Sequence, residues 1–201
     1  MKKFAMLVAA VMTTATLSAQ TSTKKDVLET ARSANNYFMA KYADPTVPTN
    51  VKRIRPSSLW TRAVYYEGLM ALNTIDPQKR YIDYTDRWAS FHKWTPRNGT
   101  KTRDADDQCC SQTYLERFMM TGDSTMLFPT RENLRGQMAE TKIDYWTWID
   151  AIQMAMPVYA QMYKITGDRA YLEHGMKMYR WSRNECGGGL FNTKSGLWWR
   201  D

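Results

Sequence analysis

The sequence predicts an all-α fold built from helical hairpins in one globular unit. Its 201 residues are 43% hydrophobic, which is enough to bury a core. Only 10 Gly and 7 Pro stand against 14 Met, 12 Tyr and 8 Trp, a balance that favours long helices with aromatic faces over a turn-rich β fold. A similar turn recurs around Asp76, Asp123 and Asp168, at steps of 47 and 45 residues.

Residues 1–19 are expected to be a secretory signal peptide. Lys2 and Lys3 precede the apolar run 4–12, and small residues lead up to Ala19. The run is shorter than the ~20 residues that cross a bilayer, and no later segment approaches that length. We therefore expect no membrane span and an exported bacterial chain, periplasmic or secreted, whose mature part is residues 20–201.

The net charge is modest. The formal charge of +8 includes Lys2 and Lys3, so the mature chain is expected to carry +6. The basic residues are scattered, and the densest group lies at 52–55. This distribution argues against a nucleic-acid partner and favours an anionic small ligand.

The cysteines indicate neither a metal site nor a full set of disulfides. Cys109, Cys110 and Cys186 are an odd number in an oxidising compartment, so at least one thiol is unpaired within the chain. Burial as small hydrophobic residues is favoured over a bridge to Cys186. The spacing fits no zinc pattern, because there is no CxxC motif and His92 and His174 are distant in sequence.

The helices are expected in a regular order. A first helix at 24–42 precedes a Pro-containing link at 44–56. The helix before each turn is apolar and aromatic, and the helix after it has one polar face, which predicts an inner and an outer layer. The inner helices are expected at 57–73, 107–121 and 146–166, and the outer ones at 77–92, 123–137 and 168–183.

The turns have the residues that end one helix and begin the next. Gly122 and Gly167 favour the left-handed conformation that ends a helix, and the aspartate after each accepts bonds from the N–H groups of the next helix. At the first turn Asp76 is the expected N-cap and Pro77 the first helical residue.

The connections predict where a cleft forms. Short turns leave the C-terminal ends of the inner helices, whereas the longer connections, 93–106 and 184 onward, return to the N-terminal ends. The long loops and the starts of the inner helices therefore share one face, where binding sites tend to form.

Aspartates concentrate at this face. Asp144 and either Asp104 or Asp106 are expected to cap helices, which leaves Asp107 and Asp150 on the helices themselves. Asp150 lies between Trp148 and an apolar run, where a carboxylate is either ion-paired or has a raised pKa. A raised pKa suits a general acid, and this interpretation is favoured for Asp150. For Asp107, catalysis and capping are equally supported.

Tryptophans gather near the same face and predict a surface that stacks on sugar rings. Any one of them is more often part of a core, but five at one end favour a binding cleft; they are Trp60, Trp146, Trp148, Trp198 and Trp199.

Pro157, inside the helix expected at 146–166, should remove the hydrogen bond to the carbonyl of Gln153 and favours a kink.

Three segments resemble the unsaturated glucuronyl and rhamnogalacturonyl hydrolases, glycoside hydrolase families 88 and 105. They are residues 148–154 (WIDAIQM), 105–115 (ADDQCCSQTYL) and 189–201, and the likeness extends from about residue 57 to the end. The resemblance implies an (α/α)6 six-hairpin barrel. It also implies an exo-acting enzyme that removes a 4,5-unsaturated uronic acid from the non-reducing end of pectin-derived or similar oligosaccharides, with no metal or organic cofactor.

The resemblance also implies residue roles. An aspartate protonates C4 of the enol ether and helps water add at C5, in place of the usual attack at the anomeric carbon. Asp150 resembles this acid and base, Asp107 the second carboxylate and Trp148 the stacking partner. Further substrate contacts are expected from Asp106, Trp146, Met154, Trp199 and Arg200. Many relatives carry His near the position of Arg200, so the contact there is expected to differ.

Three hairpins and a leading helix account for about half of the barrel. Six hairpins of ~45 residues need about 270 residues, so we expect an N-terminal fragment of a longer catalytic domain. Two alternatives stay open: an exported α-solenoid that binds sugar or protein without catalysis, and another (α/α)6 sugar enzyme such as a mannan hydrolase or a lyase.

Overall fold

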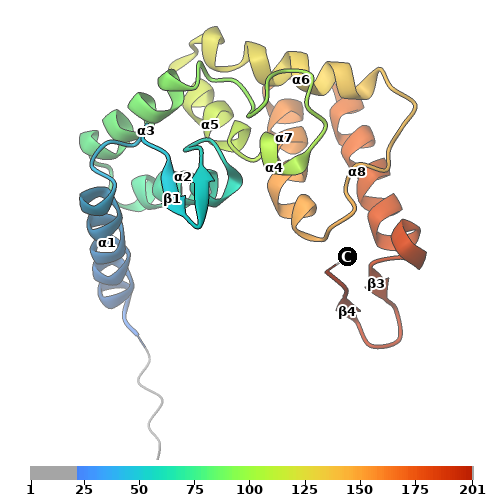
Figure 1. Ribbon diagram of the computed structural model, residues 1–201, viewed down its shortest axis with the longest axis horizontal. Coiled ribbons are helices and arrows are strands. Elements are labelled where there is room, and N and C mark those ends of the chain that lie inside the picture. The colour runs from blue at the N-terminus through green and yellow to red at the C-terminus, as the bar shows by residue number, and fades with distance from the viewer. Residues whose placement is uncertain (1–21, 201) are drawn as a thin grey trace, which may run out of the picture.

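The computed structural model describes residues 22–200, and the chain there is mostly helical (Figure 1). The expected signal segment 1–19 lies outside these residues. No helix within 22–200 is long and apolar enough to span a membrane. The helices are α1 (Lys24–Lys41), α2 (Trp60–Ile75), α3 (Lys79–Phe91), α4 (Ala105–Gln108), α5 (Ser111–Thr121), α6 (Phe128–Met138), α7 (Asp150–Thr166) and α8 (Arg169–Asn184).

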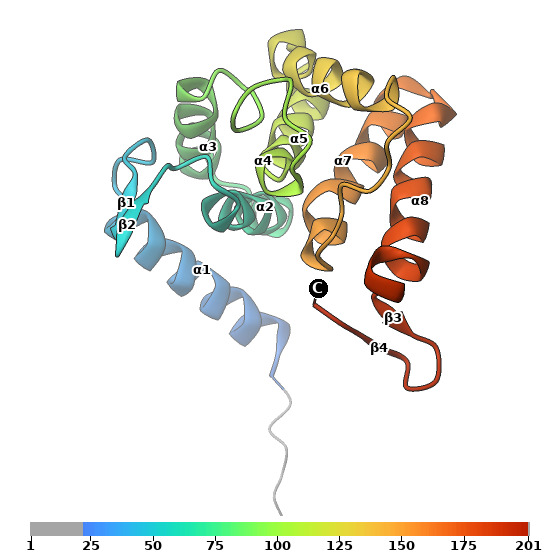
Figure 2. The same ribbon diagram turned by 45° about the vertical axis from the view of Figure 1, so that its right-hand side comes forward.

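The expected hairpins are confirmed. They are α2–α3, α5–α6 and α7–α8, and α5 packs between α2 and α7. Figures 1 and 2 show the helices following an arch from α1 to α8 that is open on one side. The amphipathic outer helices cover the apolar inner ones, so the arrangement places α2, α5 and α7 along the inside.

Two of the three turns have the expected caps. Gly122 and Gly167 adopt the left-handed conformation, with φ of 74° and 72°. The side chain of Asp123 accepts a bond from the N–H of Thr125 in the short 3-10 helix η1 (Ser124–Met126), and Asp168 accepts one from Ala170. Glycine takes this backbone conformation without the clash that a Cβ atom causes.

The first turn differs from the prediction. Gln78, and not Asp76, is the N-cap residue of α3, and Pro77 precedes the helix. Asp76 instead ends α2 and forms an ion pair with Arg32 of α1 at 2.6 Å. The Arg32 guanidinium holds the pKa of Asp76 down at about 2. The turn therefore fastens the leading helix to the first hairpin.

The inner helices begin at different residues than predicted. The segment expected at 107–121 is α4 followed by α5, and α4 begins at Ala105 with Asp104 as its N-cap. The segment expected from Trp146 becomes helical only at Asp150. Asp144 is therefore not a cap, and it pairs with Lys142 at the surface.

Two short antiparallel hairpins of strands lie in segments that were expected to be links. Strands β1 (Thr49–Val51) and β2 (Arg53–Arg55) pair before α2. A second 3-10 helix, η2 (Cys186–Gly188), follows α8 and leads into β3 (Phe191–Asn192) and β4 (Leu197–Trp198), which pair near the C-terminus.

Aromatic residues dominate the core. Tyr66 stacks on Trp88 with 3.8 Å between ring centroids, and Tyr114 packs beside them. Cys109 and Cys110 are buried in the same core, and Cys186 is half-buried. All three thiols are free, so no bridge to Cys186 forms, and the expected burial is confirmed for Cys109 and Cys110.

Pro157 lies inside α7 and has no N–H to donate to the carbonyl of Gln153. The side chain of Gln112 in α5 supplies the missing donor. Its Nε2 lies 3.0 Å from the carbonyl oxygens of both Gln153 and Met154. The proline therefore leaves the Gln153 carbonyl free to accept a hydrogen bond that links α5 to α7.

Candidate active site

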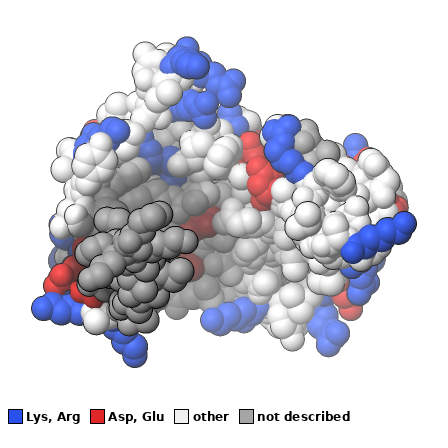
Figure 3. Space-filling model, turned by 90° about the horizontal axis from the view of Figure 1, so that it is seen from below, with Lys and Arg blue, Asp and Glu red and all other residues white. Residues whose placement is uncertain are grey.

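A cavity of about 240 Å³ opens where α4 and α7 begin. It lies at the face where the loop preceding α4 and the C-terminal segment return to the inner helices. Figure 3 shows this side hollowed, with acidic side chains in and beside the hollow and basic ones around it. The lining residues are Asp104, Ala105, Asp106, Tyr145, Thr147, Trp148, Asp150 and Ala151.

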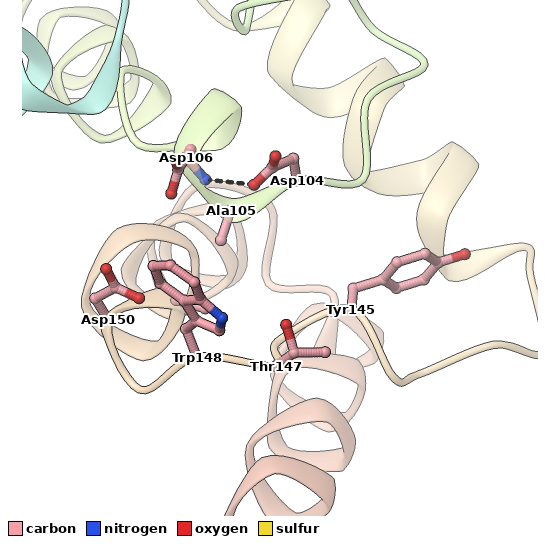
Figure 4. Close-up of a pocket in the computed structure, with 8 residues that line it drawn as sticks. Asp104, Ala105, Asp106, Tyr145, Thr147, Trp148 and Asp150 are labelled. Atoms are coloured by element: carbon pink, nitrogen blue, oxygen red, sulfur yellow. Dashed lines mark hydrogen bonds between the residues drawn. The ribbon is translucent and has the colours of Figure 1, made fainter. Parts of the chain in front are cut away.

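Carboxyl groups from two helices meet in this cavity. Asp106 comes from the first turn of α4, and Asp150 is the first residue of α7 (Figure 4). Asp104 also lines the cavity, but its carboxylate accepts the backbone N–H of Asp106 at 3.0 Å as the helix cap. Asp106 and Asp150 are thus the carboxyls that the cavity offers to a ligand.

The environment of Asp106 favours its protonated form. Burial is the largest cause, followed by the negative charges of Asp104, Asp150 and Asp107, and together they raise the pKa of Asp106 to about 6. Arg97 opposes the shift. Carboxylates that share one site cannot all ionise easily, because each disfavours the charge of the others. The cavity therefore holds a carboxyl that binds a proton at mildly acid pH.

Asp107 does not line the cavity, although the resemblance implied that it is the second carboxylate of the site. It is buried, and its carboxylate is 2.7 Å from Nη1 of Arg97 and 2.6 Å from the hydroxyl of Thr102. Asn98 also donates to it at 3.0 Å. A helix turns by about 100° per residue, so neighbouring aspartates face different environments. Asp107 fastens the loop before α4, and Asp106 faces the cavity.

Trp148 is the aromatic surface of the cavity. Its side chain is 48% exposed, and Figure 4 shows the indole beside Asp150, with Tyr145 pointing away. The guanidinium of Arg200 lies 4.5 Å from the centroid of Trp148. The carbonyl of Arg200 accepts the N–H of Ile149 at 2.9 Å, which holds the C-terminal segment against the start of α7. Trp199, beside Arg200, is also exposed.

The other predicted aromatic and apolar contacts lie elsewhere. Trp146 is fully buried and packs against Tyr159, and Met154 is buried in the same core. The helix begins after Trp146, so its indole points into the protein instead of the cleft. Trp60 is half-buried against the core, and Trp198 packs on Phe191.

Sequence reasoning overlooked Glu67, in the middle of α2. Its carboxylate accepts bonds from Cys109 and Gln153, which lie on the two helices of the cavity. The signal was a lone acidic residue in an apolar inner helix. Within residues 22–200, no group of three or more His, Cys, Asp or Glu side chains is placed to hold a metal ion.

The family model of Glycosyl Hydrolase Family 88 matches residues 30–201. The chain belongs to this family. A curated relative is the unsaturated 3S-rhamnoglycuronyl hydrolase of Alteromonas sp. (strain LOR), which is 28% identical over 84% of this chain and 46% of its own length. The chain thus spans about half the length of that curated relative.

Solved structures agree on the fold. A family 88 glycosyl hydrolase from Bacteroides vulgatus is 28% identical and superposes with a TM-score of 0.78, over 90% of this chain and 52% of its own. A polysaccharide lyase with 23% identity and a TM-score of 0.76, over 88% of this chain and 50% of its own, also matches. So does a possible family 105 member from Klebsiella pneumoniae (16% identity, TM-score 0.66, 98% and 56%). The last two show the fold alone. The chain is about half of the six-hairpin barrel expected from the sequence.

Proposed function

We propose that this chain forms part of an exo-acting hydrolase that removes a 4,5-unsaturated uronic acid from the non-reducing end of an oligosaccharide. The observation that carries the proposal is the pairing of Asp106 and Asp150 in one cavity beside the exposed indole of Trp148. The family and the name of the Alteromonas relative support an unsaturated glycuronyl substrate. Pectin-derived oligosaccharides are the substrates that we propose first.

The reaction needs one proton at C4 and one water at C5. Asp150 donates its proton to C4 of the enol ether, whose π electrons form the new C–H bond and leave positive charge shared by C5 and the ring oxygen. Water adds at C5 while the Asp150 carboxylate takes its proton. The hemiketal then opens to a ketone at C5, and the hemiacetal left at C1 expels the remaining sugar. Asp150 ends as it began, and one water has been consumed.

Asp106 takes the place of the second carboxylate, which the family resemblance had implied for Asp107. Asp106 lines the cavity, whereas the carboxylate of Asp107 is already bonded by Arg97, Asn98 and Thr102. The raised pKa of Asp106 keeps it protonated to about pH 6, so that it donates a hydrogen bond to a sugar hydroxyl while Asp150 protonates the double bond.

Trp148 and Arg200 complete the proposed binding site. The flat face of Trp148 stacks on the sugar ring. The uronate is an anion in a cavity lined by carboxylates, so a cation must offset the repulsion. Arg200, over the ring of Trp148, supplies that charge. Trp199 extends the aromatic surface toward the next sugar.

The test follows the double bond of an unsaturated disaccharide by its ultraviolet absorbance during incubation with the 201-residue chain. We expect wild-type protein to consume the double bond and Asp150→Asn to lose this turnover. The matched control is Asp144→Asn, because Asp144 is a neighbouring surface aspartate that does not line the cavity. Turnover by Asp150→Asn at the wild-type rate would refute the role proposed for Asp150.

We also propose that residues 1–19 are removed on export and that residues 20–201 form part of a catalytic (α/α) barrel domain. The proposal rests on the charged and apolar pattern of the first 19 residues. The mass of the protein recovered from a secreting bacterial host tests it. A chain that retains Met1 in the cytoplasm would contradict it.

A further inference from the structure

Glu67 bonds to both helices that carry the cavity carboxyls. It lies in the middle of α2, where it is half-buried. Its Oε1 accepts the thiol of Cys109 at 3.1 Å, and its Oε2 accepts Nε2 of Gln153 at 2.7 Å. One side chain therefore connects α2 to the end of α4 and to α7.

Each partner of Glu67 lies three residues after one of the cavity aspartates. Cys109 follows Asp106 by three residues, and Gln153 follows Asp150 by three residues. Residues three apart share one face of a helix, and the backbone of Cys109 is helical, with φ of −52° and ψ of −44°. Glu67 thus holds each helix one turn beyond its cavity carboxyl.

We propose that Glu67 is a positioning residue that sets how closely Asp150 approaches Asp106. This inference rests on the proposed function only in that the two carboxyls act together there. Gln112 already holds α7 through the backbone carbonyls of Gln153 and Met154. The bond from Glu67 adds the third helix and fixes the Gln153 side chain, so that α7 is held from two directions.

The environment of Glu67 suits a positioning residue better than a direct contact with substrate. Burial raises its pKa, and both carboxylate oxygens are occupied by donors from neighbouring helices. It does not line the cavity of Asp106 and Asp150. Loss of Glu67 therefore acts on the substrate only through the spacing of the other two carboxyls.

The pKa of Asp106 reports this spacing without requiring turnover. The charged groups that act on Asp106 are Asp104, Asp107, Asp150 and Arg97, and only Asp150 belongs to α7. If α7 moves away, the repulsion from Asp150 weakens and the pKa of Asp106 falls toward its ordinary value. Carbon-13 NMR of the aspartate carboxyls during a pH titration measures this directly.

Two variants separate spacing from charge. Glu67→Leu removes both hydrogen bonds and the charge. Glu67→Gln removes only the charge, because its amide still bonds Gln153 once that side chain flips. We expect the pKa of Asp106 to fall by roughly half a pH unit in Glu67→Leu and to stay at the wild-type value in Glu67→Gln. Equal shifts of the Asp106 pKa in both variants would mean that Glu67 acts by its charge. No shift in either variant would mean that Glu67 does not position α7, and each result overturns the proposal.

Gln153→Leu keeps the test decisive if Glu67→Leu does not fold. Gln153 is exposed, so its replacement removes the same bond from the opposite partner without opening the core. We expect a similar fall in the pKa of Asp106, and an unchanged value would overturn the proposal. Where wild-type protein turns over the unsaturated disaccharide, Gln153→Leu should lower kcat about tenfold and leave KM nearly unchanged. Failure of wild-type turnover would count against the proposed function and leave the titration result standing.

Discussion

Asp107→Ala should destabilise the protein, because the buried Asp107 carboxylate bonds to three residues of the loop before α4. The side chain of Asp107 is only 3% exposed, and its partner Arg97 is 29% exposed. The substitution removes the ion pair and also leaves the hydroxyl of Thr102 and the amide of Asn98 without their acceptor. Breaking a buried pair from one side costs about 3–5 kcal/mol.

Water can reach the Arg97 guanidinium in part, so we expect the lower end of that range, about 3 kcal/mol in the free energy of unfolding. For a chain of this size that loss lowers Tm by roughly 6–12 °C. Chemical denaturation followed by tryptophan fluorescence measures the free energy, and circular dichroism measures Tm.

The matched control is Asp83→Ala. Asp83 pairs with Lys79 on the surface of α3, and the two side chains are 56% and 86% exposed. Exposed pairs of this kind contribute less than about 1 kcal/mol, so the control should stay near wild type. If Asp107→Ala loses less than about 1 kcal/mol of stability but abolishes turnover, Asp107 acts in the cavity and its structural role in the loop before α4 is refuted.

Three further predictions concern single groups. The pKa of Asp106 is about 6 in the folded chain and 3.8 ordinarily, so the folded state binds more protons between these values and the stability falls as pH rises through them. Asp106→Asn should abolish this part of the pH dependence of urea unfolding, and an unchanged dependence would refute the raised pKa. Gln112→Ala should lower the free energy of unfolding by about 1–3 kcal/mol, and by less in a Pro157→Ala background, where residue 157 can donate to the carbonyl of Gln153. Additive losses in this double-mutant cycle would contradict the hydrogen bond from Gln112 to that carbonyl. Ellman's reagent should label Cys186 before Cys109 and Cys110, whose pKa values are raised by burial, and rapid labelling of all three in native protein would show that the core is open.

The repeated turns made the hairpins predictable because their signals are local. Glycine at 122 and 167 and the following aspartates act within a few residues, so the sequence alone indicates where those helices end and begin. Asp76 was misassigned because its partner, Arg32, is 44 residues away in the chain. An ion pair between distant segments leaves no pattern in either one.

The site shows the same division. Asp150 and Trp148 were predicted from their place at the start of an inner helix, and both line the cavity. The choice between Asp106 and Asp107 depends on the rotation of α4, which is set by Arg97, Asn98 and Thr102 in the preceding loop. The burial of Trp146 depends likewise on the helix beginning at Asp150, four residues later than expected. These are tertiary effects that composition and spacing do not contain.

A substrate in which sulfur replaces the glycosidic oxygen tests the central claim most directly. Addition of water at the double bond does not require protonation of the linking atom, so we predict that the protein consumes the double bond of the sulfur-linked compound and releases the thiol. The signal of the alkene hydrogen at C4, followed by NMR, should disappear as the thiol forms. Cleavage of the oxygen-linked compound alone, with the double bond of its sulfur analogue intact, would contradict the hydration chemistry assigned to Asp150.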